Sequence, residues 1–508
     1  MKVVLIGLPT KNIGNKFPNI GVLTIAQYVR SQGHDVHVID VVRYGYSIDD
    51  VLMKLKSLNP DLIGLSGIIT SYYYFEPLAI KLKKLLPNTP VVVGGGITCV
   101  IDMIEKYTEI DYAIKGEGEH VMLSLISLLE ANHNVQDYDI AGLYVRKGHI
   151  FKHPSVEQEY PDLSNSLYPA YEFYDMDYYI SSSTQNTYRF LKLYPEVREK
   201  VGEGVNFFSV AITRGCPYKC SFCFRFVKKF RHPTTANAVG HLKMIKEKYN
   251  CRGINLLDEL AILDKKWFID FCETLFKEVP DLKIFAGVGR ANLLSDEIIY
   301  SAKEAGFIRI GCGIESGSQK MLDLLNKKTT VEQNRSAVKR VKDSGMMATC
   351  NFIFGTPGEN RETLKETEKF IADNLDPRDY AINLAIAYPG TPLFDHAVEK
   401  GILKKENIHD YILNATFGNY PLNLSEFEST ARLIREVDLM QFRLMLNTLL
   451  KERATKDLLK LIYMRVRNEI IYLLSIIMPQ LILRMRKYYV DRRFLKIQKK
   501  LVAEDRTQ

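Results

Sequence analysis

Two stretches of this chain alternate short β-branched runs with amphipathic helical patterns, and that alternation constrains the fold more than any other feature. In the first stretch, residues 1 to about 130, we expect strands at 3–8, 36–41, 62–66 and 91–93, with helices starting at Gly21, Ile48 and Tyr74. Strands that are each followed by a helix pair in parallel and carry helices on both faces. The first stretch therefore predicts an α/β domain with a doubly wound parallel sheet.

The alternation returns between about residue 206 and residue 392. The strand candidates are Phe207–Ile212, Gly253–Leu257, Lys283–Val288, Ile308–Gly313, Ala348–Phe354 and Ala381–Ala387. In barrels built from βα repeats, reactive side chains lie at the carboxyl ends of the strands. Polar residues that directly follow these six runs are therefore the candidate site residues.

Cys216, Cys220 and Cys223 form a C-x3-C-x2-C run directly after the first of these strands. Three thiolates can hold a four-iron cluster and leave one iron without a protein ligand. A structural zinc site is the alternative, but it needs a fourth Cys or His at short spacing, and the nearest downstream histidine is His232. The other five cysteines are scattered through apolar stretches, where buried free thiols are expected.

The run Arg214–Cys223, with Phe222 just before the third cysteine, resembles the signature of the radical S-adenosylmethionine (SAM) family. The resemblance implies that the three cysteines bind a [4Fe-4S] cluster and that SAM chelates the open iron. One electron, from a donor such as flavodoxin or ferredoxin, would then cleave SAM to a 5'-deoxyadenosyl radical. It also implies that residues 206–394 fold as a partial, TIM-like (β/α)6 barrel.

Three further phrases resemble SAM-binding motifs of this family, in the family's order. Arg290, at the end of the third strand, would meet the SAM carboxylate, for which a guanidinium is suited. Glu315 and Ser316 lie in Gly311–Ser318, where the carboxylate would accept hydrogen bonds from the ribose. Gly355 lies in a phrase that packs against adenine, and a glycine permits close backbone approach.

Two other strand ends carry candidates with more than one interpretation. Asp258 and Glu259 follow the second strand, where they would either lie near the SAM amino group or cap the next helix. Tyr388 begins Tyr388–Leu393, which resembles a phrase of the cobalamin-dependent branch of the family. That phrase predicts a shaping turn, with Tyr388 as the candidate catalytic residue facing the substrate.

The first domain resembles the Rossmann-like cobalamin (B12)-binding domains that precede radical SAM barrels. The resemblance rests on Phe17–Gly21, Gly64–Ser66, Val93–Gly96 and Asp111–Glu119, and it implies a set of cofactor-binding residues: Ser66, Gly94, Gly95, Gly96 and Glu117. The loop Leu8–Lys16 lacks the histidine that ligates cobalt in classical domains. His37 alternates with apolar neighbours and is expected to be a strand residue. Cobalamin bound without a histidine ligand is therefore the expectation.

A chain of 508 residues is too long to fold around a single hydrophobic core of ordinary size, so we expect several domains. We expect a cobalamin domain at 1–130, an ordered tyrosine-rich linker at 131–205, the barrel at 206–394 and a helical C-terminal region at 395–508. In that last region Leu433, Val437, Met440, Phe442 and Leu446 are core candidates.

The basic excess of the chain is concentrated near its C-terminus. Residues 465–500 hold ten Lys or Arg and two Asp or Glu, an excess equal to the whole net charge of +8. The remainder is nearly neutral, which argues against nucleic acid as a partner. The charge-free run Ile470–Leu483 is shorter than the ~20 residues of a spanning helix. It would lie at a membrane surface, favouring a lipidic substrate, or pack on the barrel or on a second copy.

The resemblance leads to one principal function: cobalamin-dependent radical SAM methylation of an unactivated carbon in a small-molecule or lipid substrate. A radical SAM cyclase, oxidative or adenosyl-transfer enzyme is the nearest alternative. An iron–sulfur and cobalamin sensor is an alternative of another class. A methylthiotransferase would need a second cysteine triplet, which the sequence lacks. Because the N-terminus resembles no secretory leader, the expected location is the cytoplasm, with membrane association if the basic tail binds there.

Overall fold

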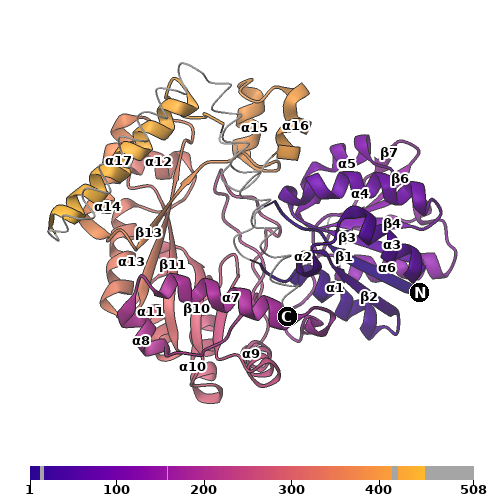
Figure 1. Ribbon diagram of the computed structural model, residues 1–508, viewed down its shortest axis with the longest axis horizontal. Helices are drawn as coiled ribbons and strands as arrows, with labels where there is room; N and C mark the ends of the chain where they lie inside the picture. Colours follow the sequence, from indigo (N-terminus) through magenta and orange to yellow (C-terminus); the bar gives the residue numbers. More distant parts are fainter. Residues whose placement is uncertain (12–15, 157, 415–421, 452–508) are drawn as a thin grey trace, which may run out of the picture.

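The computed structural model describes residues 1–11, 16–156, 158–414 and 422–451. Figure 1 shows two sheets in two separate parts of the molecule, the first in indigo and purple and the second in pink and orange. The first sheet has the strand order β2-β1-β3-β4-β5-β6-β7. Its strands are β1 (Lys2–Gly7), β2 (Asp35–Asp40), β3 (Leu62–Ser66), β4 (Val91–Gly94), β5 (Tyr112–Ile114), β6 (Leu143–Lys147) and β7 (Ile150–Lys152).

Side chains of β1 alternate between the two faces of the first sheet. Val3 and Leu5 pack against α1 (Ile20–Ser31) and α6 (Glu119–Glu130). Val4 and Ile6 pack on the other face against α3 (Ile48–Leu58), α4 (Tyr72–Leu85) and α5 (Ile101–Tyr107). The short α2 (Val41–Tyr44) follows β2. Burial on both faces is typical of doubly wound sheets, so the predicted architecture is confirmed.

The first sheet continues beyond the expected boundary at residue 130. Strands β1 to β5 are parallel, whereas β6 and β7 add an antiparallel edge. Leu143 and Val145 of β6 join the same buried cluster as Val3 and Leu5. We therefore propose that the first domain extends to Lys152 at least.

The second sheet consists of six parallel strands in chain order, β8 to β13. They are β8 (Phe207–Val210), β9 (Gly253–Leu256), β10 (Lys283–Gly289), β11 (Phe307–Glu315), β12 (Met347–Phe354) and β13 (Tyr380–Leu384). Helices that pack on their outer face are α9 (Thr235–Tyr249), α10 (Lys265–Glu278), α11 (Asp296–Glu304), α13 (Val331–Asp343) and α14 (Arg361–Asn374). The short α12 (Gln319–Leu324) follows β11. Because β8 and β13 end the strand order, the predicted partial barrel is confirmed.

The segment expected as an ordered tyrosine-rich linker contains two helices, α7 (Met176–Leu191) and α8 (Pro195–Val201). Helix α7 lies along the edge strand β8, where the Phe207 N–H donates to Thr184 Oγ1 at 2.8 Å. The hydroxyls of Ser183 and Ser209 lie 2.9 Å apart. The helix thus supplies a partner to a strand edge that would otherwise present unpaired backbone groups.

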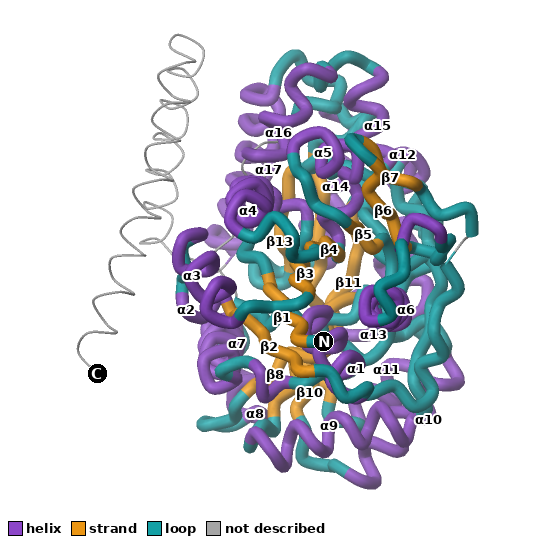
Figure 2. The backbone as a smooth tube through the Cα atoms, turned by 90° about the vertical axis from the view of Figure 1, so that its right-hand side faces the viewer, coloured by secondary structure: helices purple, strands orange, loops and turns teal. Residues whose placement is uncertain are grey.

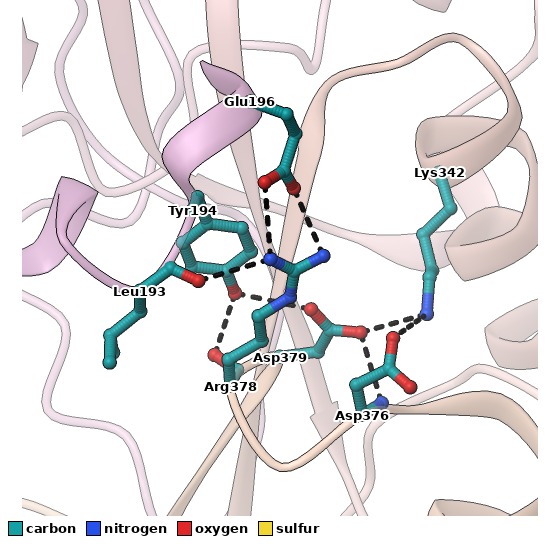
Figure 3. Close-up of polar contacts among 7 residues, drawn as sticks. All are labelled: Leu193, Tyr194, Glu196, Lys342, Asp376, Arg378 and Asp379. Carbon is teal, nitrogen blue, oxygen red and sulfur yellow. Dashed lines mark hydrogen bonds and ion pairs between the residues drawn. The ribbon is translucent and has the colours of Figure 1, made fainter. Parts of the chain in front are cut away.

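A polar network ties α8 to the beginning of β13, at the other end of the strand order (Figure 3). The Tyr194 hydroxyl donates to the Arg378 carbonyl at 2.6 Å and to Asp379 Oδ1 at 3.1 Å. Arg378 pairs with Glu196 at 2.9 Å, and Lys342 pairs with Asp379 at 2.8 Å. Helices α7 and α8 therefore link the two edge strands β8 and β13, and α8 packs with Phe207 of β8, Phe285 of β10 and Met347 of β12.

The described C-terminal region is helical, with α15 (Pro392–Glu399), α16 (Ile408–Asn414) and α17 (Thr430–Lys451). The predicted core residues Leu433, Val437 and Met440 are buried, whereas Phe442 and Leu446 are half-buried. Figure 2 shows α16 beside α4, and His409 of α16 pairs with Glu76 of α4 at 2.8 Å.

The basic segment 465–500 and its apolar run Ile470–Leu483 lie outside the described residues. Within the described ranges, no helix combines the length and apolar character needed to cross a bilayer.

Candidate functional site

The three cysteines lie in a loop that leaves the carboxyl end of β8 and is closed at its base by Arg214 and Arg231. These two residues pair as an antiparallel bridge with two N–H to carbonyl hydrogen bonds of 2.9 Å. Inside the loop, the Cys216 N–H donates to the Val227 carbonyl at 3.1 Å. Gly215 has φ +84°, and a Cβ there would overlap the Lys229 carbonyl, so this turn requires glycine.

All three cysteines are free thiols; Cys220 is buried, Cys216 is half-buried and Cys223 is exposed. Among the described residues, no three His, Cys, Asp or Glu side chains converge on one metal ion. A four-iron cluster has different requirements, because each thiolate binds its own iron atom. Burial raises the pKa of the Cys216 thiol, so metal binding has to displace a proton there. Three cysteines in one glycine-hinged loop fit such a cluster.

Arg290 comes from the end of β10 and reaches the cysteine loop. Its guanidinium donates from Nη1 to the Cys220 sulfur at 3.5 Å and from Nη2 to the Lys327 carbonyl. Although Arg290 is buried, its Nε has no hydrogen-bond partner among the described residues. A buried donor without a partner is costly, and an anionic ligand group such as a carboxylate would satisfy it.

The fourth-strand candidates have protein partners. Glu315 Oε1 accepts from Lys327 Nζ at 2.8 Å, and both side chains are buried. Glu315 also has φ +64°, which is strained for a residue with a side chain. The Ser316 hydroxyl lies 3.0 Å from that of Thr367 on α14 and supports the turn that follows. For Glu315 to bind a ribose, its carboxylate would have to use lone pairs beyond those that Lys327 occupies.

Gly355 follows β12 and has φ +88°, and its N–H donates to a carboxyl oxygen of Glu359. A Cβ at Gly355 would lie 2.7 Å from Leu433 Cδ2 of α17. Burial raises the pKa of Glu359 to about 8. This buried carboxyl is therefore largely protonated at neutral pH, a feature that its position in the sequence does not reveal.

Asp258 binds the backbone at the entrance to the cysteine loop. Its carboxylate accepts from the Ile212 N–H at 3.1 Å and from the Thr213 hydroxyl at 2.6 Å. The helix-capping alternative was wrong, because α10 begins at Lys265 and is capped by Asp264. Glu259 lines a cavity, where desolvation raises its pKa to about 7.

That cavity, of about 360 Å³, lies between the two domains. One wall is the carboxyl edge of the first sheet, with Ser66, Gly94 and Gly95 from the predicted cofactor set. Gly95 has φ +86°, and a Cβ there would lie 2.6 Å from the Gly67 carbonyl oxygen. Gly94 and Gly95 present backbone without side chains to the cavity, which suits close approach of a large flat ligand. Gly96 is buried and does not line the cavity.

The opposite wall contains Thr213, Arg214 and Asp258 from the barrel. Glu117 also lines the cavity, but its carboxylate pairs with Arg214 and Arg231. Both domains thus contribute to one cavity beside the cysteine loop.

Two aromatic residues outside the predicted site set belong to this cavity. Tyr168 and His241 line it, with their rings stacked at 4.5 Å and 7°. Burial lowers the pKa of His241 to about 3, so its imidazole is neutral. No motif marks either residue, because one lies in the connecting segment and the other in the middle of α9. His37 lies on β2 as expected and faces Asp35 at 3.1 Å.

Tyr388 does not line this cavity, although its turn contacts both domains. A Cβ at Gly390 would lie 2.9 Å from Phe224 of the cysteine loop and 3.4 Å from Cβ of Cys99 in the first domain. Burial raises the pKa of the Tyr388 hydroxyl to about 12. The predicted turn is present, and a catalytic role for Tyr388 stays a prediction.

Two family models match separate parts of the chain. Residues 210–371 match the radical SAM superfamily, and residues 8–126 match the B12 binding domain. The chain is 28% identical to the uncharacterized methyltransferase PH0819 of Pyrococcus horikoshii, covering 81% of this chain and 86% of that protein. It is 29% identical to the anaerobic magnesium-protoporphyrin IX monomethyl ester cyclase of Rubrivivax gelatinosus, covering 76% and 68%.

One solved structure has the same arrangement of domains. The cobalamin-dependent S-adenosylmethionine radical enzyme OxsB, with aqua-cobalamin bound, aligns with a TM-score of 0.65. The alignment covers 93% of this chain and 72% of that one, at 20% sequence identity. At this identity the likeness shows the fold.

Proposed function

We propose that this chain, which is a cobalamin-dependent radical SAM enzyme, methylates an unactivated carbon atom of a small-molecule or lipid substrate. The observation that carries the proposal is the interdomain cavity, which is lined by Gly94 and Gly95 of the B12-binding domain and by Thr213 and Glu259 of the barrel. Radical transfer and methyl transfer to one carbon require both cofactors to face the same space.

Separate sets of residues would bind the two cofactors. Cys216, Cys220 and Cys223 would ligate the cluster, and Arg290 Nε, which has no partner among the described residues, would bind the SAM carboxylate. Ser66, Gly94 and Gly95 would receive cobalamin on the exposed backbone of the sheet edge. Bound there, the cluster and SAM supply a 5'-deoxyadenosyl radical, and cobalamin supplies a transferable methyl group.

The cavity walls suit a reactive carbon radical. The lining is mainly apolar and includes Leu5, Val92 and Met122 from the first domain. Because a primary carbon radical abstracts hydrogen from any nearby C–H bond, the protein has to hold the substrate carbon close and keep other groups away. The neutral ring of His241, stacked on Tyr168, adds no charge to this wall.

A radical SAM cyclase is the second candidate. It is favoured by one comparison, the 29% identity to the magnesium-protoporphyrin IX monomethyl ester cyclase. Such an enzyme would use the same cluster and SAM site without net methyl transfer.

The experiment is anaerobic reconstitution with iron, sulfide and hydroxocobalamin, followed by SAM and a strong reductant. Both 5'-deoxyadenosine and S-adenosylhomocysteine are quantified. Formation of both, with cobalamin retained, supports the methyltransferase. Deoxyadenosine alone supports the cyclase, and neither product, with cobalamin still bound, supports a sensor.

Further parts of the proposal concern partners and location. A small acidic carrier such as flavodoxin or ferredoxin would deliver the electron, in the cytoplasm. A lipid substrate would follow if residues 465–500, outside the described ranges, bind a membrane surface. Vesicle flotation of the full chain, with and without these residues, tests that point.

A further inference from the structure

Both arginines that close the cysteine loop are bound by glutamates of the B12-binding domain. Arg214 Nη1 lies 2.5 Å from Glu119 Oε1 and 3.4 Å from Glu117 Oε2. Arg231 Nη2 donates to Glu117 Oε1. Because all three cysteines lie between residues 214 and 231, the base of the cluster-bearing loop is attached to the other domain.

Both carboxylates of these ion pairs are buried, with side chains that are 4% exposed for Glu117 and 6% for Glu119. Of their partners, the side chain of Arg231 is 10% exposed and that of Arg214 is 27% exposed. By contrast, the ion pair between Arg198 and Glu203 has side chains that are 38% and 72% exposed. Exposed pairs contribute little, whereas removing one partner of a buried pair leaves an uncompensated charge.

The connecting segment reinforces the same junction. Gln158 accepts from the Glu117 N–H at 3.1 Å and donates to the Glu117 carbonyl. Arg231 donates from Nη1 to the Pro161 carbonyl at 2.6 Å, and its guanidinium lies 4.9 Å from the ring centre of Tyr160. The first domain, the connecting segment and the cysteine loop thus contact one another around Glu117.

We infer that Glu117 and Glu119 are positioning residues, which hold the cysteine loop in its cluster-accepting conformation from across the domain boundary. This inference rests on the proposed function. It assigns to Glu117 a role besides direct cofactor binding: its Oε1 accepts a hydrogen bond from Arg231, whereas its Oε2 lies 3.4 Å from Arg214 Nη1 and has no hydrogen-bond partner among the described residues. The B12-binding domain is then required for a stable cluster as well as for methyl transfer.

The test uses the full chain with Glu117→Gln and Glu119→Gln, and with Glu203→Gln as the matched control in an exposed pair. Glutamine keeps the size of the side chain and removes its charge. We expect amide hydrogen exchange across residues 214–231 to become at least ~10-fold faster in both glutamate variants, since each removes a buried charge partner of a loop arginine. Iron retained after anaerobic gel filtration should fall to less than about half, and the control should match the parent.

Arg231→Gln provides the second measurement. If Glu117 acts through Arg231, the double variant Glu117→Gln/Arg231→Gln should exchange no faster than either single variant. Additive effects in the double variant would contradict the inference. So would parental exchange and iron retention in both glutamate variants. Loss of hydroxocobalamin binding with unchanged loop exchange would overturn it in favour of direct cofactor binding by Glu117.

These readouts do not depend on methyl transfer. If the parent retains a cluster but forms no methylated product, the proposed function fails while the positioning role can still be measured.

Discussion

The guanidinium of Arg290 lies over the ring of Tyr218, 3.5 Å from its centroid. Tyr218 is inside the cysteine loop, and Arg290 comes from the end of β10, so this stacking fixes the orientation of the guanidinium. Planar stacking of this kind is available to arginine and not to lysine.

Arg290→Lys should therefore retain the cluster and lower the rate of SAM cleavage by at least ~10-fold, through loss of stacking and of the Nε donor. Iron content and 5'-deoxyadenosine formation are measured together. Arg252→Lys, at an exposed arginine, is the control and should leave both unchanged. Parental cleavage rates in Arg290→Lys would contradict a role in binding SAM.

Replacement of Cys216, Cys220 or Cys223 by Ala should each abolish cluster assembly and SAM cleavage. The first domain should stay folded and bind hydroxocobalamin, because the loop contributes little to its core. Cys251→Ala, at a buried free thiol outside the loop, should keep the cluster. Intact turnover in any loop variant would remove that cysteine from the ligand set.

Gly95→Ala should weaken hydroxocobalamin binding, measured by absorbance titration. The added Cβ would lie 2.6 Å from the Gly67 carbonyl oxygen and 3.0 Å from Ser66 Oγ, at a φ of +86°. The strain alone is of order 1–3 kcal/mol. Gly33→Ala has nearly the same φ, +84°, and no atom within 4 Å, so it carries the strain without the overlap. Equal titrations for both variants would show that the overlap does not affect the cavity.

Glu359→Gln should remove part of the pH dependence of stability. Because burial raises the pKa of Glu359 to about 8, its carboxyl stays protonated in the folded chain while it ionises in the unfolded chain. The parent should therefore lose stability as pH rises from about 4.5 to 8. Melting temperatures at several pH values, for parent and variant, measure the difference. Parallel curves would refute the shifted pKa.

Tyr194→Phe should lower the free energy of unfolding by about 1–2 kcal/mol, because Asp379 and the Arg378 carbonyl lose a buried donor. Tyr300→Phe, at a side chain that is 67% exposed, should change it little. Differential scanning calorimetry compares the two. An unchanged transition in Tyr194→Phe would show that the hydroxyl is dispensable for the link between α8 and β13.

The sequence predicts those structural features that depend on residues close together in the chain. The cysteine spacing, the βα alternation and the glycines at strand ends all depend on neighbouring residues, and the structure places them in the expected elements. The two polar residues after β9 show the limit of such reasoning, since Asp258 binds Thr213 through a contact across 45 residues.

Features that depend on distant partners were missed. Helix α7 contains Ser181, Ser182, Ser183 and Thr184, which favour helices weakly, and it forms against the edge of β8. The pairing of Glu117 with Arg231 spans 114 residues and links two domains. The sequence does not predict which charged residues will pair, because a chain with 68 Lys or Arg and 60 Asp or Glu offers many possible partners for each of them.

The helix that shields β8 precedes the barrel in the chain, which matters to anyone wishing to isolate that domain. A fragment cut at residue 206 would contain all six barrel strands and lack the cover over one of their edges. Exposed strand edges recruit other strands, so this fragment would be prone to self-association. A barrel fragment that keeps this edge covered therefore has to begin before Met176, the first residue of α7.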